Sequence, residues 1–90
     1  HIIITRNYRM GRSEVDVISL KGDCLYLNEV KYRSSAVELI EDLIDQRQIN
    51  RIIRAGIPLL HRYQAAELKV ILIHYWGNSK GPKVFHVNID

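Results

Sequence analysis

The spacing of apolar residues changes twice along this chain, and that change constrains the fold more than any other feature. Three segments near the start are rich in β-branched and apolar residues, and one of them begins with a strict apolar–polar alternation. Such alternation is typical of a half-buried strand. A helical spacing follows, and two more strand-like segments close the sequence. The predicted strands are residues 2–8, 14–20, 24–33, 67–76 and 83–89.

Turn signals between these segments predict how the strands connect. MGRS occupies residues 10–13, and KGD at 21–23 places a Gly-Asp pair between two apolar runs, which is typical of a hairpin. The helical connection before the fourth strand allows the third and fourth strands to lie parallel. GNSKGP at 77–82 predicts a final hairpin. We therefore expect an α/β fold with a mixed five-stranded sheet in the order β-β-β-α-β-β, flanked by helix.

The connection between the third and fourth strands carries two apolar stripes. The first contains Val37, Ile40, Leu43 and Ile44, and the second contains Ile49, Ile52, Ile53, Ile57 and Leu60. They point in nearly opposite directions on a helical wheel, so one straight helix cannot bury both. Ser35 and Glu38 resemble a capping box that starts a first helical piece. We expect a break near residues 45–48, with Asp45 capping a second helix and Pro58 kinking or ending it.

Composition limits the class of protein. Ninety residues fit a single domain, 1–90, and 47% apolar with 26% charged residues is ordinary for a soluble globular protein. The longest apolar runs are too short to span a bilayer, so we expect no membrane partner. Cys24 is the one cysteine, which fits a reducing cytoplasm. His1 leads straight into an apolar run, so we expect further residues to precede it in a longer polypeptide.

Charged residues interrupt the second and third strands at a spacing of two. Glu14 and Asp16 share one face of the second strand, and Glu29 and Lys31 share one face of the third, because residues two apart in a strand point the same way. Pairing through a turn near Gly22 would bring the two sets together. Spacing alone favours ordinary solvent-facing charges on a half-exposed antiparallel sheet.

The alternative is a site for chemistry. Two carboxylates from adjacent strands suit a hard divalent cation such as Mg²⁺, which prefers oxygen ligands and keeps several waters. A nearby ammonium group can orient a water molecule or offset charge on a phosphate. Together these groups would suit hydrolysis of a phosphodiester assisted by a metal ion.

The surrounding motifs resemble a family of predicted bacterial endonucleases distantly related to archaeal Holliday junction resolvases. The resemblance covers residues 2–35 and rests on three segments: Arg6-Asn7-Tyr8-Arg9, Glu14-Val15-Asp16-Val17-Ile18 and Glu29-Val30-Lys31-Tyr32-Arg33. These are elements of the PD-(D/E)xK nucleases, which have a restriction endonuclease-like core. The family's fold begins with a helix that carries a further glutamate, and that helix is absent from these 90 residues.

The resemblance implies an endonuclease that uses Mg²⁺ or Mn²⁺ to hydrolyse DNA, with branched or structured DNA as one class of substrate. It implies that Asp16 and Glu29 bind the metal ion, with the backbone carbonyl of Val30 as a third ligand. Lys31 matches the catalytic lysine. Glu14 matches the acidic residue that precedes the metal-binding aspartate.

Basic residues give the chain a net charge of +3, which permits a polyanionic partner. Three arginines at i, i+4 and i+7 form a narrow stripe opposite the apolar face of the second helix. A solvated helix face is the simpler interpretation, and a surface for DNA phosphates is the other. The predicted DNA-contacting residues are Arg6, Arg9, Arg12, Arg33, Arg47, Arg51 and Arg54.

Two other classes of function are compatible with the sequence. A nucleic-acid-binding module that keeps the nuclease fold without cutting would bind DNA in a salt-dependent way, insensitive to Asp16→Ala and to chelators. A structural or assembly domain would not bind DNA at all. In either case the first and last strands are expected edges of the sheet, and exposed edges favour homodimers.

Overall fold

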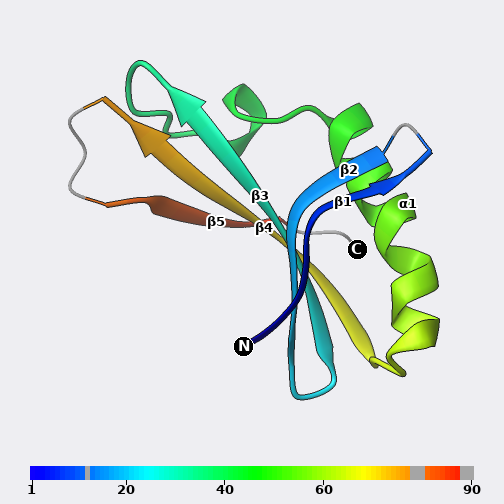
Figure 1. The fold of residues 1–90 in the computed structure, drawn as a ribbon. Helices are drawn as coiled ribbons and strands as arrows, with labels where there is room; N and C mark the ends of the chain where they lie inside the picture. The colour runs from blue at the N-terminus through cyan, green and yellow to red at the C-terminus, as the bar shows by residue number, and fades with distance from the viewer. Residues whose placement is uncertain (12, 78–80, 88–90) are drawn as a thin grey trace.

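The computed structural model describes residues 1–11, 13–77 and 81–87, which form a mixed five-stranded sheet with one long helix against it (Figure 1). The elements in chain order are β1 (Ile2–Met10), β2 (Ser13–Lys21), β3 (Cys24–Arg33), the 3-10 helix η1 (Ile40–Asp42), α1 (Gln46–Arg62), β4 (Glu67–Trp76) and β5 (Lys83–Val87). The predicted order β-β-β-α-β-β is confirmed.

The strands lie in the order β1-β2-β3-β4-β5. β1, β2 and β3 form an antiparallel meander, β3 and β4 are parallel, and β5 returns antiparallel to β4. Each of these pairings was expected from the turn signals and from the helical connection. β1 and β5 are the sheet edges, and pairing of two copies through such an edge stays a prediction. The predicted loop at 77–82 and the end of the predicted fifth strand reach residues outside the described ones.

The hairpin between β2 and β3 sets the register of the candidate site. Lys21 pairs with Cys24, so Gly22 and Asp23 form a two-residue turn. Gly22 has φ +60°, a conformation that a residue with a side chain rarely adopts. The Gly-Asp signal in the sequence therefore predicted this turn, and the register follows from it.

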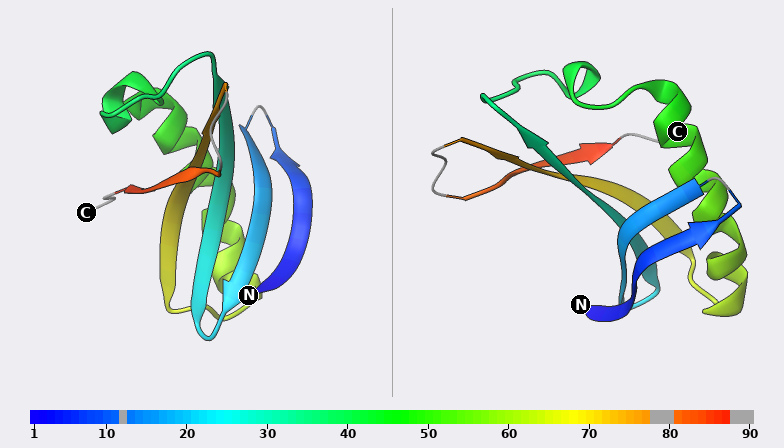
Figure 2. Two further views of the ribbon diagram at one scale, coloured as in Figure 1. Left: turned by 90° about the vertical axis from the view of Figure 1, so that its left-hand side faces the viewer. Right: turned by 45° about the horizontal axis from the view of Figure 1, so that its top comes forward.

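One face of the sheet packs against α1 and carries the core. Leu25 and Leu27 of β3 lie beside Val70 of β4, and α1 packs Ile52 and neighbouring apolar residues onto them. Figure 2 shows α1 on this face of the twisted sheet, with β1 and β2 curling toward the helix. The residues on this face alternate along each strand, so a charged residue on the same face points toward α1.

The prediction of a helix that starts near Ser35 is wrong, except for the short helix η1. The chain between β3 and η1 is not helical, and Leu39 is extended with φ −102° and ψ 133°. The backbone N–H of Val37 donates to Nε2 of the buried His74 at 3.1 Å. A guanidinium N–H of Arg33 donates to the carbonyl of Leu43 at 3.1 Å. These contacts with the ends of β3 and β4 outweigh the local capping signal, because they hold the segment in an extended path.

The second predicted helix is confirmed. α1 starts after Asp45, whose side chain accepts a hydrogen bond from the backbone N–H of Gln48 at 2.7 Å. This is the expected N-cap contact. The prediction that Pro58 could end the helix is wrong, since α1 continues to Arg62. Leu59 is buried directly after the proline, and its packing against the core favours continuation of the helix.

Gly56 lies where α1 approaches the sheet closely. A Cβ atom at this position would lie 2.6 Å from Cδ1 of Leu27 and 3.1 Å from Cδ1 of Leu68. We expect Gly56→Val to lower the free energy of unfolding by about 1–3 kcal/mol, because overpacking forces neighbouring side chains to shift. Chemical denaturation would measure the change. Ile57→Val, on the exposed side of α1, is the control, and an equal effect of both variants would contradict this packing.

Within residues 1–11, 13–77 and 81–87, no helix is long and apolar enough to cross a membrane.

Candidate active site

β2 and β3 separate at the position where the carboxylates lie. Their paired register runs from Lys21 and Cys24 to Val17 and Asn28, where the recorded pairing of these described strands stops. The next opposing residues would be Asp16 and Glu29. Instead, the backbone N–H of Val30 donates to Oδ2 of Asp16 at 2.8 Å. The side chain of Asp16 therefore lies in the gap where β2 and β3 separate, and we call this gap the fork. On the N-terminal side of Asp16, β2 turns toward α1 (Figure 1).

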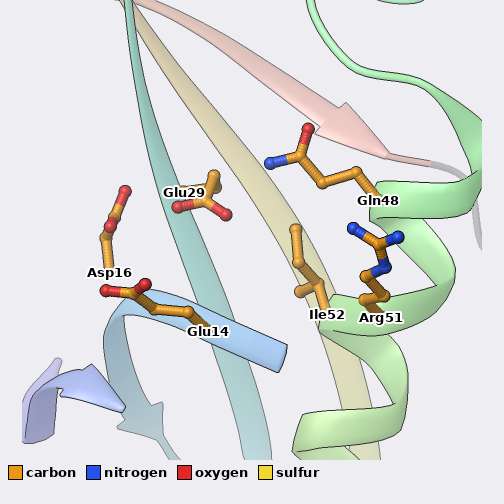
Figure 3. Close-up of a pocket in the computed structure, with 6 residues that line it drawn as sticks. All are labelled: Glu14, Asp16, Glu29, Gln48, Arg51 and Ile52. Carbon is orange, nitrogen blue, oxygen red and sulfur yellow. The ribbon is translucent and has the colours of Figure 1, made fainter. Parts of the chain in front are cut away.

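The fork opens into a pocket of about 250 Å³. Figure 3 shows Glu14, Asp16 and Glu29 on one side of it, from β2 and β3. Gln48, Arg51 and Ile52 of α1 lie on the other side and complete the lining. Glu29 shares the face of β3 that carries Leu25 and Leu27, so the same alternation that builds the core also directs this carboxylate toward the helix.

Glu29 has an unusual environment for an acidic residue. Its side chain is only 7% exposed. The pKa of Glu29 is raised from 4.5 to about 8. Burial is the largest cause, a hydrogen bond with Asp16 and the negative charges of Asp16 and Glu14 also raise this pKa, and the positive charge of Lys31 lowers it. Carboxylates that share one site in this way cannot all ionise without cost. The acidic side of the pocket is therefore predisposed to take up either a proton or a cation.

Lys31 follows Glu29 on the same face of β3 and is partly exposed. It does not contribute to the pocket lining, yet its charge reaches Glu29. Val30 is half-buried, and its N–H is engaged with Asp16. The prediction that its carbonyl binds a metal ion stays a prediction.

The predicted carboxylates are thus brought together, whereas the predicted arginines are divided among several places. Arg51 lines the pocket. Arg9 lies 3.6 Å from Glu14 in an exposed ion pair, a kind of contact that contributes little to stability. Arg33 donates to the carbonyls of Tyr32 and Leu43, at 2.9 and 3.1 Å, so it holds the chain that follows β3.

The remaining predicted arginines lie on the surface or cannot be placed. Arg6 on β1 and Arg47 and Arg54 on α1 are exposed. Arg12 lies outside the described residues. DNA contact by the seven arginines stays a prediction, and Arg33 already binds backbone carbonyls of its own chain.

Two lining residues were missed by the reasoning from sequence. Gln48 was interpreted only as part of a helix start, and Ile52 only as core. Gln48, Arg51 and Ile52 stand at i, i+3 and i+4, which places them on one side of a helix. That spacing was visible in the sequence, but nothing local indicated which side of the helix would meet the carboxylates.

The donor atoms at the fork are compatible with Mg²⁺. Among the residues that the structure describes, no group of three or more His, Cys, Asp or Glu is arranged to hold a metal ion. Mg²⁺ is usually bound through one or two carboxylates and several waters. Asp16 and Glu29 supply two such carboxylates beside a pocket with room for water, so the residues present fit this ion.

The structure is therefore that of a small α/β protein with an acidic pocket, which lies where β2 and β3 separate and is covered by α1. Residues 1–73 match the model of the uncharacterised protein family UPF0102, and the chain belongs to that family. It is 31% identical over 90 residues to a UPF0102 protein of Christiangramia forsetii, covering 94% of this chain and 73% of the relative.

Further relatives cover smaller parts. The chain is 40% identical over 67 residues to a UPF0102 protein of Chlorobium phaeobacteroides, covering 72% of this chain and 52% of that protein. A UPF0102 protein of Leptospira interrogans is 50% identical over 32 residues, or 36% of this chain and 28% of the relative. The chain thus spans about half the length of the Chlorobium protein.

Proposed function

We propose that this protein is a divalent-metal-dependent endonuclease of the PD-(D/E)xK type that hydrolyses DNA phosphodiester bonds. The observation that carries the proposal is the fork between β2 and β3. There Asp16 and Glu29 converge on one pocket, and the basic helix α1 forms its opposite side. Ordinary solvent-facing charges would not bury Glu29 or raise its pKa to about 8. Perturbed acids in a pocket are typical of functional sites.

Asp16 and Glu29 would hold the metal ion. The N–H of Val30 donates to Oδ2 of Asp16 and so holds this carboxylate in place beside Glu29. The metal ion supplies polarisation of a phosphoryl oxygen and a lowered pKa for water. Glu29 is buried at the pocket and would supply the second carboxylate.

Lys31 would act at the edge of this site. Its ammonium group lies two residues beyond Glu29 on the same face of β3 and has partial access to solvent. It is therefore placed to orient an attacking water molecule or to offset charge that develops on the phosphate. Glu14, which lines the pocket and pairs with Arg9, adds negative charge beside the two predicted ligands.

DNA would bind across the exposed side of α1. Arg47 and Arg54 extend the positive charge of Arg51 along the helix, and such contacts bind phosphates without reading base sequence. Recognition by backbone shape is therefore expected, which agrees with branched or structured DNA as a substrate class.

The test is cleavage of end-labelled linear and four-way-branched DNA by the purified protein. With Mg²⁺ or Mn²⁺ we expect internal cleavage of at least one substrate, and with EDTA we expect none. DNA binding without cleavage under any divalent ion would instead favour a non-catalytic binding module. Absence of binding even at low salt would exclude a nucleic-acid role.

A further inference from the structure

Arg51 differs from the other arginines of α1 because it faces three carboxylates across a pocket. It lines the pocket together with Glu14, Asp16 and Glu29 (Figure 3). In the described part of the chain, the recorded ion pair of this region joins Glu14 to Arg9, and Arg51 makes none. Within the described residues, the Arg51 guanidinium therefore faces the carboxylates across the pocket without an ion pair to them.

A pocket with one acidic side and one cationic side suits a pair of ions rather than a single ion. A divalent cation beside Asp16 and Glu29 would offset the carboxylates. An anion between that cation and Arg51 would then contact positive charge on both sides. A phosphate group has the charge and the oxygen atoms for this position, and a guanidinium binds two phosphate oxygens in a fixed geometry.

We infer that Arg51 binds the phosphate that is cleaved, opposite a metal ion held by Asp16 and Glu29. This inference rests on the proposed nuclease function and assigns Arg51 a role that Arg47 and Arg54 do not share. Charge that develops on the phosphoryl oxygens during hydrolysis would be stabilised by the guanidinium.

The two neighbouring arginines provide matched controls. Arg47 and Arg54 are exposed on the same helix but do not line the pocket. A rise of about 1.5 Å per residue places them about 6 Å and 4.5 Å from Arg51 along the axis. The flanking arginines would therefore contact DNA outside the pocket.

The first experiment separates binding from turnover. Single-turnover cleavage by saturating protein in Mg²⁺, and DNA affinity in Ca²⁺, would be measured for Arg51→Ala and Arg54→Ala. We expect Arg51→Ala to lower the saturated rate by about 100-fold with a small change in affinity. Arg54→Ala should mainly weaken DNA affinity, and its saturated rate should stay at least about 10-fold above that of Arg51→Ala. Equal saturated rates in the two variants would show that Arg51 has no special role.

A second experiment does not depend on cleavage. Thymidine 5′-monophosphate would be titrated calorimetrically into the protein with and without Mn²⁺. We expect Mn²⁺ to raise the nucleotide affinity by about 10-fold, a typical coupling between two linked ligands. That gain should be lost in Arg51→Ala and kept in Arg54→Ala.

The two experiments distinguish the inference from the function on which it rests. A wild-type protein that cuts no DNA but binds the nucleotide and Mn²⁺ together through Arg51 would overturn the nuclease proposal and support only the phosphate-binding part of the inference. An active nuclease in which Arg51→Ala retains the Mn²⁺-dependent gain would overturn the inference alone.

Discussion

Asp16→Asn is expected to lower Mg²⁺-dependent DNA cleavage by at least about 100-fold while the protein stays folded. An asparagine side chain can still accept the hydrogen bond that the N–H of Val30 makes with Oδ2 of Asp16, but it lacks the negative charge needed to hold a divalent cation. Cleavage rates would be compared at equal protein concentration, with circular dichroism to confirm folding.

The choice of asparagine follows from the structure. Asp16→Ala would also remove the partner of the Val30 N–H, and an unsatisfied, partly buried donor costs about 1–3 kcal/mol. Asp23→Asn, in the turn at the other end of β2 and β3, is the matched control because it removes an exposed carboxylate outside the pocket. Undiminished cleavage by Asp16→Asn would mean that Asp16 is not a metal ligand.

Glu29→Gln is expected to make the protein more stable at alkaline pH and inactive as a nuclease. The pKa of Glu29 is raised from 4.5 to about 8 in the folded protein. Between these values the folded chain keeps a proton that the unfolded chain has released. Stability therefore falls as pH rises through this interval, and the loss is complete above the folded pKa. Glutamine resembles the protonated acid and removes this dependence.

The measurement is the melting temperature of both proteins from acid to alkaline pH. The melting temperature of the wild type should fall relative to that of Glu29→Gln as the pH rises toward about 8 and then run parallel to it. Glu67→Gln, at an exposed position on β4, controls for the loss of a carboxylate. A constant difference between wild type and Glu29→Gln across the whole range would rule out the raised pKa.

Local signals in the sequence were sufficient where the structure is decided by neighbouring residues. The Gly-Asp turn gave the hairpin of β2 and β3, and Asp45 marked the start of α1. They were insufficient where a distant residue decides. Ser35 and Glu38 predict the start of a helix. The hydrogen bond between Val37 and His74, which lie 37 residues apart, instead holds this segment in an extended path. Nothing near Val37 indicates that partner.

The same division applies to the candidate site. Two-residue spacing and a single turn were enough to place Asp16 and Glu29 side by side. The separation of the strands beyond them was not predictable, because it depends on a side chain replacing a backbone partner at Val30. The contribution of Gln48 and Ile52 depends on the orientation of α1 over the sheet, which is determined by packing at positions such as Gly56.

The hydrogen bond between Arg33 and Leu43 is a further contact that the sequence did not indicate. From sequence it belonged with the DNA-binding arginines, since it follows the predicted catalytic lysine by two residues. In the structure its guanidinium donates to the carbonyl of Leu43. The arginine thereby ties the end of β3 to the segment that leads into α1, and it helps to place the helix that carries Arg51.

The central claim is that Asp16 and Glu29 together hold a divalent metal ion, and the most direct measurement is a crystal structure of the protein soaked in Mn²⁺. Anomalous scattering identifies manganese without reference to the chemistry that follows. The account predicts an anomalous peak between the carboxylates of Asp16 and Glu29, on the side of the pocket that faces Arg51. Carboxylates that stay apart with no manganese between them would contradict it.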